Sequence, residues 1–220
     1  EYLLNLPIVL LILKEKLPHG IFGSGALGKL VEPGEEDMMN KAGVFLDRDG
    51  TINIEKEYLS DPKQLELYSK SAKAIKELND AGIPVVVVTN QSGIGRGMFT
   101  IETLNNIHLK LAKMLKKEAG AVIDCVYFCP NTPKDKCACR KPQLGMIEKA
   151  GKELNIDTEH SYFVGDKVCD IKMGRKAGGK SVLVLTGYGK VEKKDISCQP
   201  DYIAQDLMEA VKWILKDIKK

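Results

Sequence analysis

One apolar stretch limits the fold of this chain more than any other. Residues 83–89 read IPVVVVT, an unbroken run of apolar and mostly β-branched side chains. A strand with one solvated face alternates apolar and polar residues, whereas a strand covered on both faces is apolar throughout. Helical patterns flank the run at 69–81 and 100–119. Strands and helices that alternate in this way predict an α/β fold with three layers, in which helices cover both faces of a Rossmann-like parallel sheet.

The same alternation continues over the rest of residues 41–220, which we expect to form one domain. The expected strands span 43–47, 83–89, 122–128, 161–164, 181–185 and, as a short edge strand, 202–204. The expected helices span 69–81, 100–119, 143–154, 170–177 and 206–218. Ser69 and Thr100 have the side chains of helix N-caps, and Gly82 is typical of the residue that ends a helix.

Residues 1–40 have a different pattern, and we expect them to be an N-terminal extension or connector. The apolar run at 3–13 is shorter than the roughly 20 residues of a membrane span, and it favours a packed or interface helix. It lacks the basic start and the cleavage site of a secretory signal. Residues 23–28 read GSGALG and match a dinucleotide-binding pattern. No second strand follows to complete a βαβ unit there, so a flexible connector is the favoured interpretation.

Composition argues against some partners. The formal net charge is +3, and no stripe of Lys and Arg with interleaved aromatic residues is present. Nucleic acid is therefore not an expected partner. We also expect no membrane partner, a cytoplasmic location and a monomer.

Two carboxylates follow the first expected strand. Asp47 and Asp49 should point to the same side of an extended backbone, and Arg48 to the opposite side, outside their pocket. Two carboxylates in one pocket repel each other unless a cation lies between them or one is protonated. The pair thus fits a Mg²⁺ site or a nucleophile beside a general acid. By itself, the motif fits a polar turn equally well.

The ends of the other strands decide between these interpretations. Thr89 and a polar turn follow the second strand, Arg140 and Lys141 come after the third, and Asp166 and Lys167 follow the fourth. Ligands of parallel α/β sheets bind beyond the carboxyl ends of the strands. Carboxylates suit Mg²⁺, whereas Lys, Arg and backbone N–H groups suit phosphate oxygens. These groups together indicate phosphoryl transfer.

Five motifs in this order resemble a known family. They are DRDGTIN at 47–53, TNQSGIGRG at 89–97, CRKP at 139–142, VGDK at 164–167 and VLTGYGK at 184–190. The chain resembles the haloacid-dehalogenase-like phosphatases, and within them the heptose 1,7-bisphosphate 7-phosphatase family, over roughly residues 42–218. That family removes the C7 phosphate during the synthesis of nucleotide-activated heptose for lipopolysaccharide. The related histidinol-phosphate phosphatases, which share a short loop after Asn131, are the alternative, and a nucleic-acid 3′-phosphatase is a weaker one.

The resemblance implies a role for each carboxylate. Asp47 would be the nucleophile that forms an aspartyl-phosphate intermediate. Asp49 would protonate the leaving oxygen and then deprotonate the hydrolytic water. Asp47, the backbone carbonyl of Asp49, and Asp166 would hold Mg²⁺. Asp170 is either an outer partner of this site or the N-cap of its helix, and the cap is the favoured interpretation.

The resemblance also implies residues that handle the substrate. Thr89 and Lys141 would stabilise the transferring phosphoryl group, and Arg140 would recognise the substrate. The spacing leaves no room for a large cap domain, so loops at 94–99 and 129–142 should form the specificity pocket. The expected substrate-binding residues are Asn53, Glu55, Tyr58, Thr89, Asn90, Gln91, Ser92, Arg140, Lys141 and Lys167.

A cluster of thiols suggests a second metal. The six cysteines are Cys125, Cys129, Cys137, Cys139, Cys169 and Cys198. Cys129, Cys137 and Cys139 match the family's structural zinc loop, but Asn131 stands where that loop carries a histidine. An amide is a poor zinc ligand, so Asp135 or a water could supply the fourth position. Reduced thiols without a metal and a disulfide are the other possibilities. The three histidines, His19, His108 and His160, are expected to be solvated or locally bonded rather than catalytic.

Overall fold

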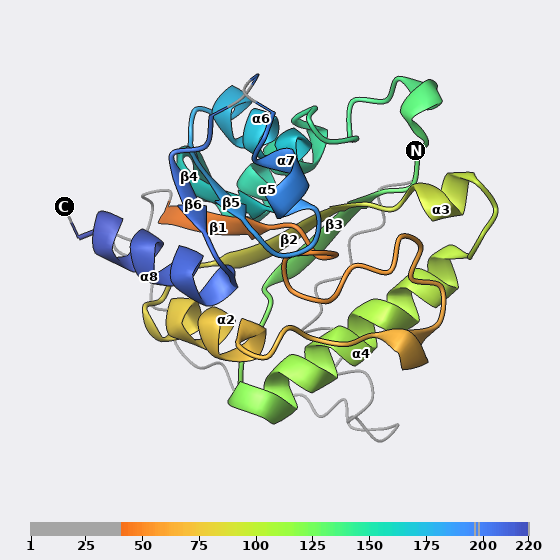
Figure 1. Cartoon of the computed structure of the whole chain (residues 1–220), viewed down its shortest axis with the longest axis horizontal. Helices are drawn as coiled ribbons and strands as arrows, with labels where there is room; N and C mark the ends of the chain where they lie inside the picture. The colour runs from red at the N-terminus through yellow and green to blue at the C-terminus, as the bar shows by residue number, and fades with distance from the viewer. Residues whose placement is uncertain (1–40, 196, 198, 220) are drawn as a thin grey trace, which may run out of the picture.

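A six-stranded parallel sheet forms the centre of the molecule (Figure 1). The computed structural model describes residues 41–195, 197 and 199–219. The predictions for residues 1–40 therefore lie outside the described part, as does Cys198. The strand order is β3-β2-β1-β4-β5-β6. The strands are β1 (Lys41–Leu46), β2 (Val85–Asn90), β3 (Cys125–Cys129), β4 (Ile156–Gly165), β5 (Lys180–Val184) and β6 (Tyr202–Ala204).

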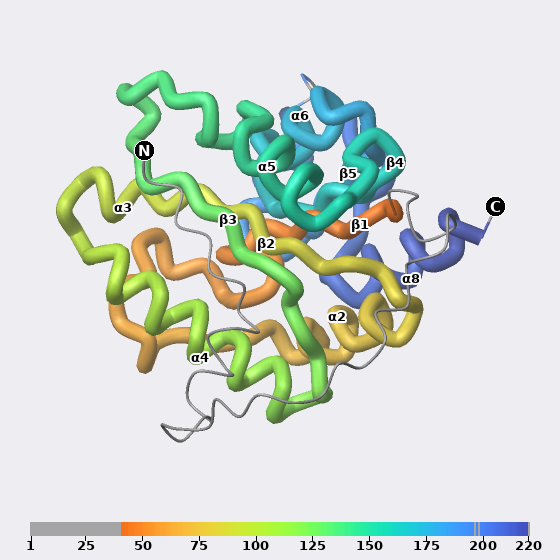
Figure 2. Tube along the Cα trace, turned by 180° about the vertical axis from the view of Figure 1, so that it is seen from behind, coloured from red at the N-terminus to blue at the C-terminus, as the bar shows by residue number. Residues whose placement is uncertain are grey.

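Helices cover both faces of this sheet. One face carries α2 (Ser71–Asp80), α4 (Ile101–Ala119) and α8 (Leu207–Asp217). The opposite face carries α5 (Gly145–Leu154) and α6 (Val168–Lys176). Figures 1 and 2 show these two helical layers with the sheet between them. The three-layer α/β prediction is confirmed.

Short elements complete the fold. The helices α3 (Ser92–Gly95) and α7 (Gly189–Glu192) follow β2 and β5, and the 3₁₀ turns η2 (Pro62–Gln64) and η3 (Pro133–Asp135) lie in loops. Only a loop with η2 separates β1 from α2, and only α3 and α4 separate β2 from β3. The predicted absence of a large cap domain is therefore confirmed. Within the described residues, no helix is both long and apolar enough to cross a membrane.

The central strand β1 contributes to both halves of the core. Val44 and Leu46 pack among the residues of α2, α4 and α8. Phe45 points to the other face and stacks on Phe163 of β4, with ring centroids 4.9 Å apart and planes 7° from parallel. Successive side chains of a strand point to opposite faces of the sheet, and here helices cover both faces. Positions on either face of a central strand are therefore buried and are occupied by apolar side chains. This explains why the strands read as unbroken apolar runs.

The strand order places two chain segments side by side. The chain adds β2 and β3 on one side of β1, and then β4, β5 and β6 on the other. The backbone N–H of Asp47 donates to the carbonyl of Val164 at 2.9 Å, so the ends of β1 and β4 are joined. A sheet whose order reverses in this way has a crevice beyond the strand ends at the reversal. The candidate site lies there.

Some predicted boundaries are confirmed and others are wrong. Thr100 caps α4 as expected, because its side chain accepts a hydrogen bond from the Thr103 N–H. Gly82 follows α2 with a φ of +69°, which suits the residue that ends a helix. The N-cap of α2 is Lys70, and no side chain caps that helix. Ser69 was therefore wrongly expected in this role.

The fourth strand begins earlier than the predicted range 161–164. Lys41 of β1 pairs with Ile156, but Val44 pairs with Tyr162, so the register shifts between these pairs. The extra residues of β4 form an irregularity in the ladder. Because the first part of β4 carries polar residues around this irregularity, its sequence does not read as a strand.

Candidate active site

A cavity of about 500 Å³ opens beyond the carboxyl ends of the central strands. It brings together residues from four strand ends, as the sequence predicted. Of the predicted site residues it is lined by Asp47, Asp49, Glu55, Tyr58, Thr89, Asn90, Gln91, Ser92, Arg140, Lys141 and Lys167. The cavity is also lined by Glu57, in the predicted substrate loop between Glu55 and Tyr58, and by Gly93, in the polar turn after Thr89. Sequence reasoning missed three further lining residues, Cys169, Tyr188 and Glu192. The predicted loop at 94–99 contributes no lining residue.

A buried ion pair lies at the floor of this cavity. The Lys141 Nζ lies 2.8 Å from Asp47 Oδ1 and 2.7 Å from Asp170 Oδ1, and it donates to the Val88 carbonyl at 2.9 Å. Burial works against the charged amine, but Asp170 and Asp47 outweigh it and raise the pKa of Lys141. The same oxygen of Asp47 accepts a hydrogen bond from the backbone N–H of Arg48 at 2.7 Å. Lys141 is thus a permanent positive charge beside the Asp47 carboxylate.

Asp170 has a different role from the predicted one. It is the third residue of α6, whose N-cap is Lys167, and its Oδ2 accepts a hydrogen bond from the Lys167 N–H at 3.1 Å. The prediction that Asp170 itself is the N-cap is wrong. Burial and the charge of Asp47 raise its pKa to about 6, although Lys141 opposes the shift. Since its other oxygen pairs with Lys141, Asp170 holds the amine together with Asp47.

Asp166 lies under the cavity in a tight backbone cradle. A Cβ atom on either Gly50 or Gly187 would overlap its carboxylate, and both glycines have positive φ. The Tyr188 N–H donates to Asp166 Oδ2 at 2.8 Å, whereas Oδ1 has no hydrogen-bond partner among the described residues. Burial, together with the charges of Asp47 and Asp170, raises the pKa of Asp166 to about 8.

This arrangement fits a divalent cation. One carboxylate oxygen from each of Asp47, Asp166 and Asp170 lies within 4.8 Å of the others. Carboxylates so close repel each other, and this repulsion adds to burial in raising the pKa of Asp166. A hard cation that prefers oxygen ligands would relieve it and would give the unpartnered Asp166 oxygen a ligand.

Asp49 is held by four donors. Arg48 contacts both of its oxygens, with Nε 3.2 Å from Oδ1 and Nη2 2.6 Å from Oδ2. Asn53 Nδ2 donates to Oδ1 at 2.9 Å, and Gln91 Nε2 donates to Oδ2 at 3.0 Å. Burial opposes ionisation, but Arg48 and the two amides outweigh it and lower the pKa of Asp49. Asp49 is therefore ionised and fixed in orientation.

The prediction for Arg48 is only partly correct. Its side chain does not line the cavity, as strand alternation required, but its guanidinium turns back onto Asp49. The reason is that β1 ends at Leu46, so alternation no longer governs the following residues. The third guanidinium nitrogen of Arg48, Nη1, lies 3.0 Å from Nε2 of His108 on α4. His108 is buried, so the expectation of a solvated or locally bonded histidine is wrong, whereas exposed His160 does bond locally to Asp157.

Three residues predicted to bind substrate bond instead to other predicted site residues. The Asn90 side chain accepts from the Lys141 N–H at 3.0 Å and donates to the Lys141 carbonyl at 3.3 Å. Gln91 bridges Asp49 and the Thr89 hydroxyl, to which it donates at 2.8 Å. Asn53 is fully buried and bonds to Asp49 without lining the cavity. These side chains position their neighbours, and any substrate contact from them stays a prediction.

The rim of the cavity carries charges of both signs. Lys167 Nζ lies 2.9 Å from Glu55 Oε2 and 4.5 Å from the ring centroid of Tyr188. Arg140 Nη1 donates to the Asn131 carbonyl at 2.9 Å, which ties Arg140 to the thiol loop. The sequence signal available for Tyr188 is its place in the VLTGYGK motif, from which no lining role was inferred.

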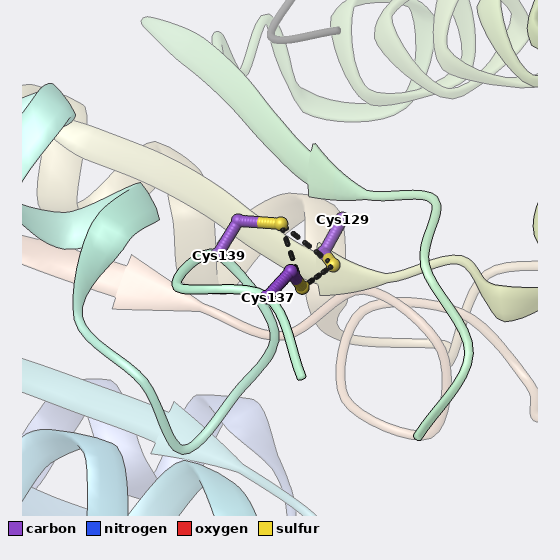
Figure 3. Close-up of side chains that lie close together, drawn as sticks. All are labelled: Cys129, Cys137 and Cys139. Carbon is purple, nitrogen blue, oxygen red and sulfur yellow. Dashed lines mark hydrogen bonds between the residues drawn. The ribbon is translucent and has the colours of Figure 1, made fainter. Parts of the chain in front are cut away.

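The three thiols of the predicted zinc loop converge (Figure 3). Their sulfur atoms lie 3.4 Å apart for Cys129 and Cys137, 3.2 Å for Cys137 and Cys139, and 2.8 Å for Cys139 and Cys129. All three are free cysteines, so the disulfide alternative is not realised. The Asn131 amide lies 3.6 Å from Cys139 Sγ. Asp135 instead accepts from the Thr132 N–H and hydroxyl, away from the thiols.

Comparisons with known proteins agree with this geometry. A family model described as HAD-hydrolase-like matches residues 138–210. The D-glycero-D-manno-heptose-1,7-bisphosphate 7-phosphatase of Thermosynechococcus vestitus is 39% identical over 189 residues, covering 80% of this chain and 96% of that protein. The corresponding Haemophilus ducreyi enzyme is also 39% identical, over 80% of this chain and 100% of its own length.

A solved structure extends the similarity to the fold. The D,D-heptose 1,7-bisphosphate phosphatase from B. bronchiseptica, complexed with magnesium and phosphate, superposes with a TM-score of 0.76. It is 33% identical and covers 80% of this chain and 99% of its own. Fold, strand-end site and relatives together define a phosphomonoester hydrolase of the haloacid-dehalogenase-like superfamily. Within that superfamily, the chain belongs to the D-glycero-D-manno-heptose-1,7-bisphosphate 7-phosphatase family.

The buried His108 should make stability depend on pH. Burial, and then the charge of Arg48, lower the pKa of His108 from 6.5 to about 3. Between these values the unfolded chain binds a proton that the folded protein does not, so stability falls as pH falls below about 6.5. From pH 7 to pH 5, the wild type should lose on the order of 2 kcal/mol more than the His108→Gln variant, as measured by urea unfolding. Parallel pH profiles for the two proteins would contradict the buried neutral state of His108.

Proposed function

We propose that this protein is a Mg²⁺-dependent phosphatase that hydrolyses the C7 phosphate of D-glycero-D-manno-heptose 1,7-bisphosphate through an aspartyl-phosphate intermediate. The observation that carries the proposal is the Asp47 carboxylate, which lines an open cavity, lies 2.8 Å from the Lys141 amine and has an oxygen within 4.8 Å of the Asp166 carboxylate. The names of relatives at 39% identity support the choice of substrate.

Asp47 is the proposed nucleophile. Its carboxylate lines the cavity and is held by the Lys141 amine and the Arg48 N–H. Attack of this carboxylate on phosphorus forms the aspartyl phosphate and breaks the bond to the sugar oxygen. Lys141 lies where it can stabilise the transferring oxygens as well as orient Asp47. Thr89, whose hydroxyl accepts from Gln91, adds a further polar group on the cavity wall.

A magnesium ion would be held by Asp47, the backbone carbonyl of Asp49, and Asp166. The unpartnered oxygen of Asp166 and the close approach of the carboxylates support this assignment. When bound, the ion supplies positive charge to the phosphate oxygens and offsets the repulsion between the two anions that must meet. A related structure in complex with magnesium and phosphate supports the same cofactor for this chain.

Asp49 is the proposed general acid and base. It donates a proton to the leaving sugar oxygen, and it then takes one from the water that attacks the aspartyl phosphate. The four donors around Asp49 keep it ionised when the cavity holds no phosphate. The negative charge of an incoming phosphate raises the pKa of a neighbouring carboxyl, which favours the protonated form needed for the first step.

The rim of the cavity is the proposed binding surface for the sugar. Arg140 and Lys167 offer positive charge to the second phosphate, and Glu55 offers oxygens to sugar hydroxyls. The remaining proposed contacts are Tyr58, Asn90, Gln91 and Ser92. Asn53 was also predicted to contact substrate, but it is fully buried and does not line the cavity, so its proposed role is to hold Asp49. We further propose a cytoplasmic monomer that acts in the synthesis of nucleotide-activated heptose for lipopolysaccharide.

Zinc is the proposed structural metal of the loop that carries Arg140. Three sulfur atoms already lie within one coordination shell, and the Asn131 side chain is next to them. A closed tetrahedral site needs a fourth ligand, which a water would supply, because an amide is a poor zinc ligand and Asn131 presents its Nδ2 to Cys139 Sγ. Bound zinc would fix the loop whose Asn131 carbonyl accepts from Arg140. It would take no part in the phosphoryl transfer itself.

Asp47→Asn should abolish turnover and leave the fold intact. The amide keeps the shape of the side chain but lacks the negative charge that attacks phosphorus. Release of phosphate from heptose 1,7-bisphosphate should fall at least about 1,000-fold. Asp80→Asn is the matched control, because Asp80 is an exposed residue that pairs with Lys76 on α2. Retained activity in Asp47→Asn would refute the nucleophile assignment.

Substrate preference separates the two enzyme hypotheses. The proposed function predicts that heptose 1,7-bisphosphate has a kcat/KM at least about tenfold above that of histidinol phosphate, since a second phosphate adds charge-assisted contacts at the rim. Phosphate release should be measured with both compounds, and position 7 confirmed by phosphorus NMR of the product. A higher kcat/KM for histidinol phosphate would favour the alternative.

Asn131→His should strengthen the zinc site. Imidazole is a far better zinc ligand than an amide, so affinity should rise at least about tenfold. Competition with a chromogenic zinc chelator measures the affinities of the wild type and the variant. Asn131→Ala serves as the control and should not bind more tightly than the wild type. Failure of the wild type to bind zinc, with three freely titrating thiols, would contradict the proposal.

A further inference from the structure

Arg48 is the largest fully buried side chain of the described chain, and it is charged. A buried guanidinium is costly unless its N–H groups find acceptors. Two of its nitrogens are used on Asp49, in a two-point contact with both carboxylate oxygens. This planar geometry suits a carboxylate and restricts its rotation. The third nitrogen, Nη1, needs a partner elsewhere.

His108 supplies that partner from a different element. Its Nε2 lies 3.0 Å from Arg48 Nη1, across 60 residues of sequence. Arginine has no acceptor, so Nε2 must accept and the imidazole must be neutral, with its proton on Nδ1. Burial and Arg48 lower the pKa of His108 and favour this form. A histidine here is thus a neutral acceptor for a buried cation.

The support behind His108 is rigid. His108 lies in the middle of α4, a 19-residue helix whose N-terminus is capped by Thr100. Three apolar side chains of this helix, Leu104, Ile107 and Leu111, are fully buried. The His108 ring lies 6.3 Å from that of Phe128 on β3. Because α4 is packed in this way, the position of His108 Nε2, the acceptor atom, is fixed relative to the sheet. His108 holds Arg48, and Arg48 in turn holds the Asp49 carboxylate.

We propose that His108 is a positioning residue that acts through Arg48 to hold the Asp49 carboxylate in place for proton transfer to the leaving group. This inference rests on the proposed function, in which Asp49 is the general acid and base. Without the acceptor on α4, the Nη1 group of Arg48 would have no hydrogen-bond partner and the guanidinium would be less firmly held. Only the amides of Asn53 and Gln91 would then still hold Asp49 in a fixed orientation. Asp49 itself remains the catalytic residue, since His108 does not line the cavity.

The experiment compares two leaving groups in His108→Leu. Cleavage of an alkyl phosphate needs a proton from Asp49, whereas p-nitrophenolate leaves without one. We therefore expect kcat/KM for heptose 1,7-bisphosphate to fall about 10- to 100-fold, and to fall at least about tenfold less for p-nitrophenyl phosphate. A role in folding alone would reduce both values by the same factor. Equal losses, or no loss, would overturn the proposal.

Two further variants separate positioning from packing. In His108→Gln, the side-chain oxygen can accept near the place of Nε2, so most of the kcat/KM for the heptose substrate should return. In His108→Asn, the polar group is too short to reach Arg48. This variant should therefore lose more kcat/KM for heptose 1,7-bisphosphate than for p-nitrophenyl phosphate, as His108→Leu does. It also serves if the leucine variant does not fold, as judged by circular dichroism. A Gln variant as impaired as Asn would overturn the proposal.

The outcome for the wild type tests the proposed function independently. If the wild type releases no phosphate from heptose 1,7-bisphosphate, the proposed function is wrong, whatever the variants do. The leaving-group comparison would then use another alkyl phosphate that the wild type hydrolyses. If the wild type is active and the variants lose both activities equally, only the role of His108 is wrong.

Discussion

The charge balance beneath the cavity is the constraint on which the site depends. Asp47, Asp166 and Asp170 are all buried, with one oxygen of each within 4.8 Å of the others. Buried carboxylates so close are unfavourable unless positive charge compensates them. Lys141 compensates two of them directly, at 2.8 and 2.7 Å. The third, Asp166, keeps a raised pKa and an unpartnered oxygen, which is the reason the arrangement suits a cation.

Much of the polar chemistry around the cavity serves to position a few reactive groups. Asn90 holds the backbone of Lys141 through two hydrogen bonds. Gln91 links Thr89 to Asp49, and Arg48 bonds to both oxygens of Asp49. Preorganised groups of this kind need no rearrangement when charge develops during the reaction. The amides of the TNQSG turn therefore contribute through geometry, whether or not they also contact the substrate.

The thiol loop connects a second region to the same site. It carries Arg140 and Lys141 directly after Cys139, and the Asn131 carbonyl accepts from Arg140. The order of this loop thus affects the position of two cations that face the cavity. Asn131, whose amide lies 3.6 Å from Cys139 Sγ, stands beside these thiols where the related zinc loop carries a histidine, and an amide is a poor zinc ligand.

The sequence alone determined the layered fold, the order of its elements and the residues that gather beyond the strand ends. These features follow from local rules, namely apolar runs, helix caps such as Thr100, and the common direction of parallel strands. Only the tertiary structure decided the partners of Arg48, His108 and Asp170. Alternation ceases to predict side-chain direction once β1 ends at Leu46, and the acceptor for Arg48 comes from a helix 60 residues away. Contacts between distant segments depend on packing that no local pattern encodes, so the groups that position the proposed acid and base were visible only in three dimensions.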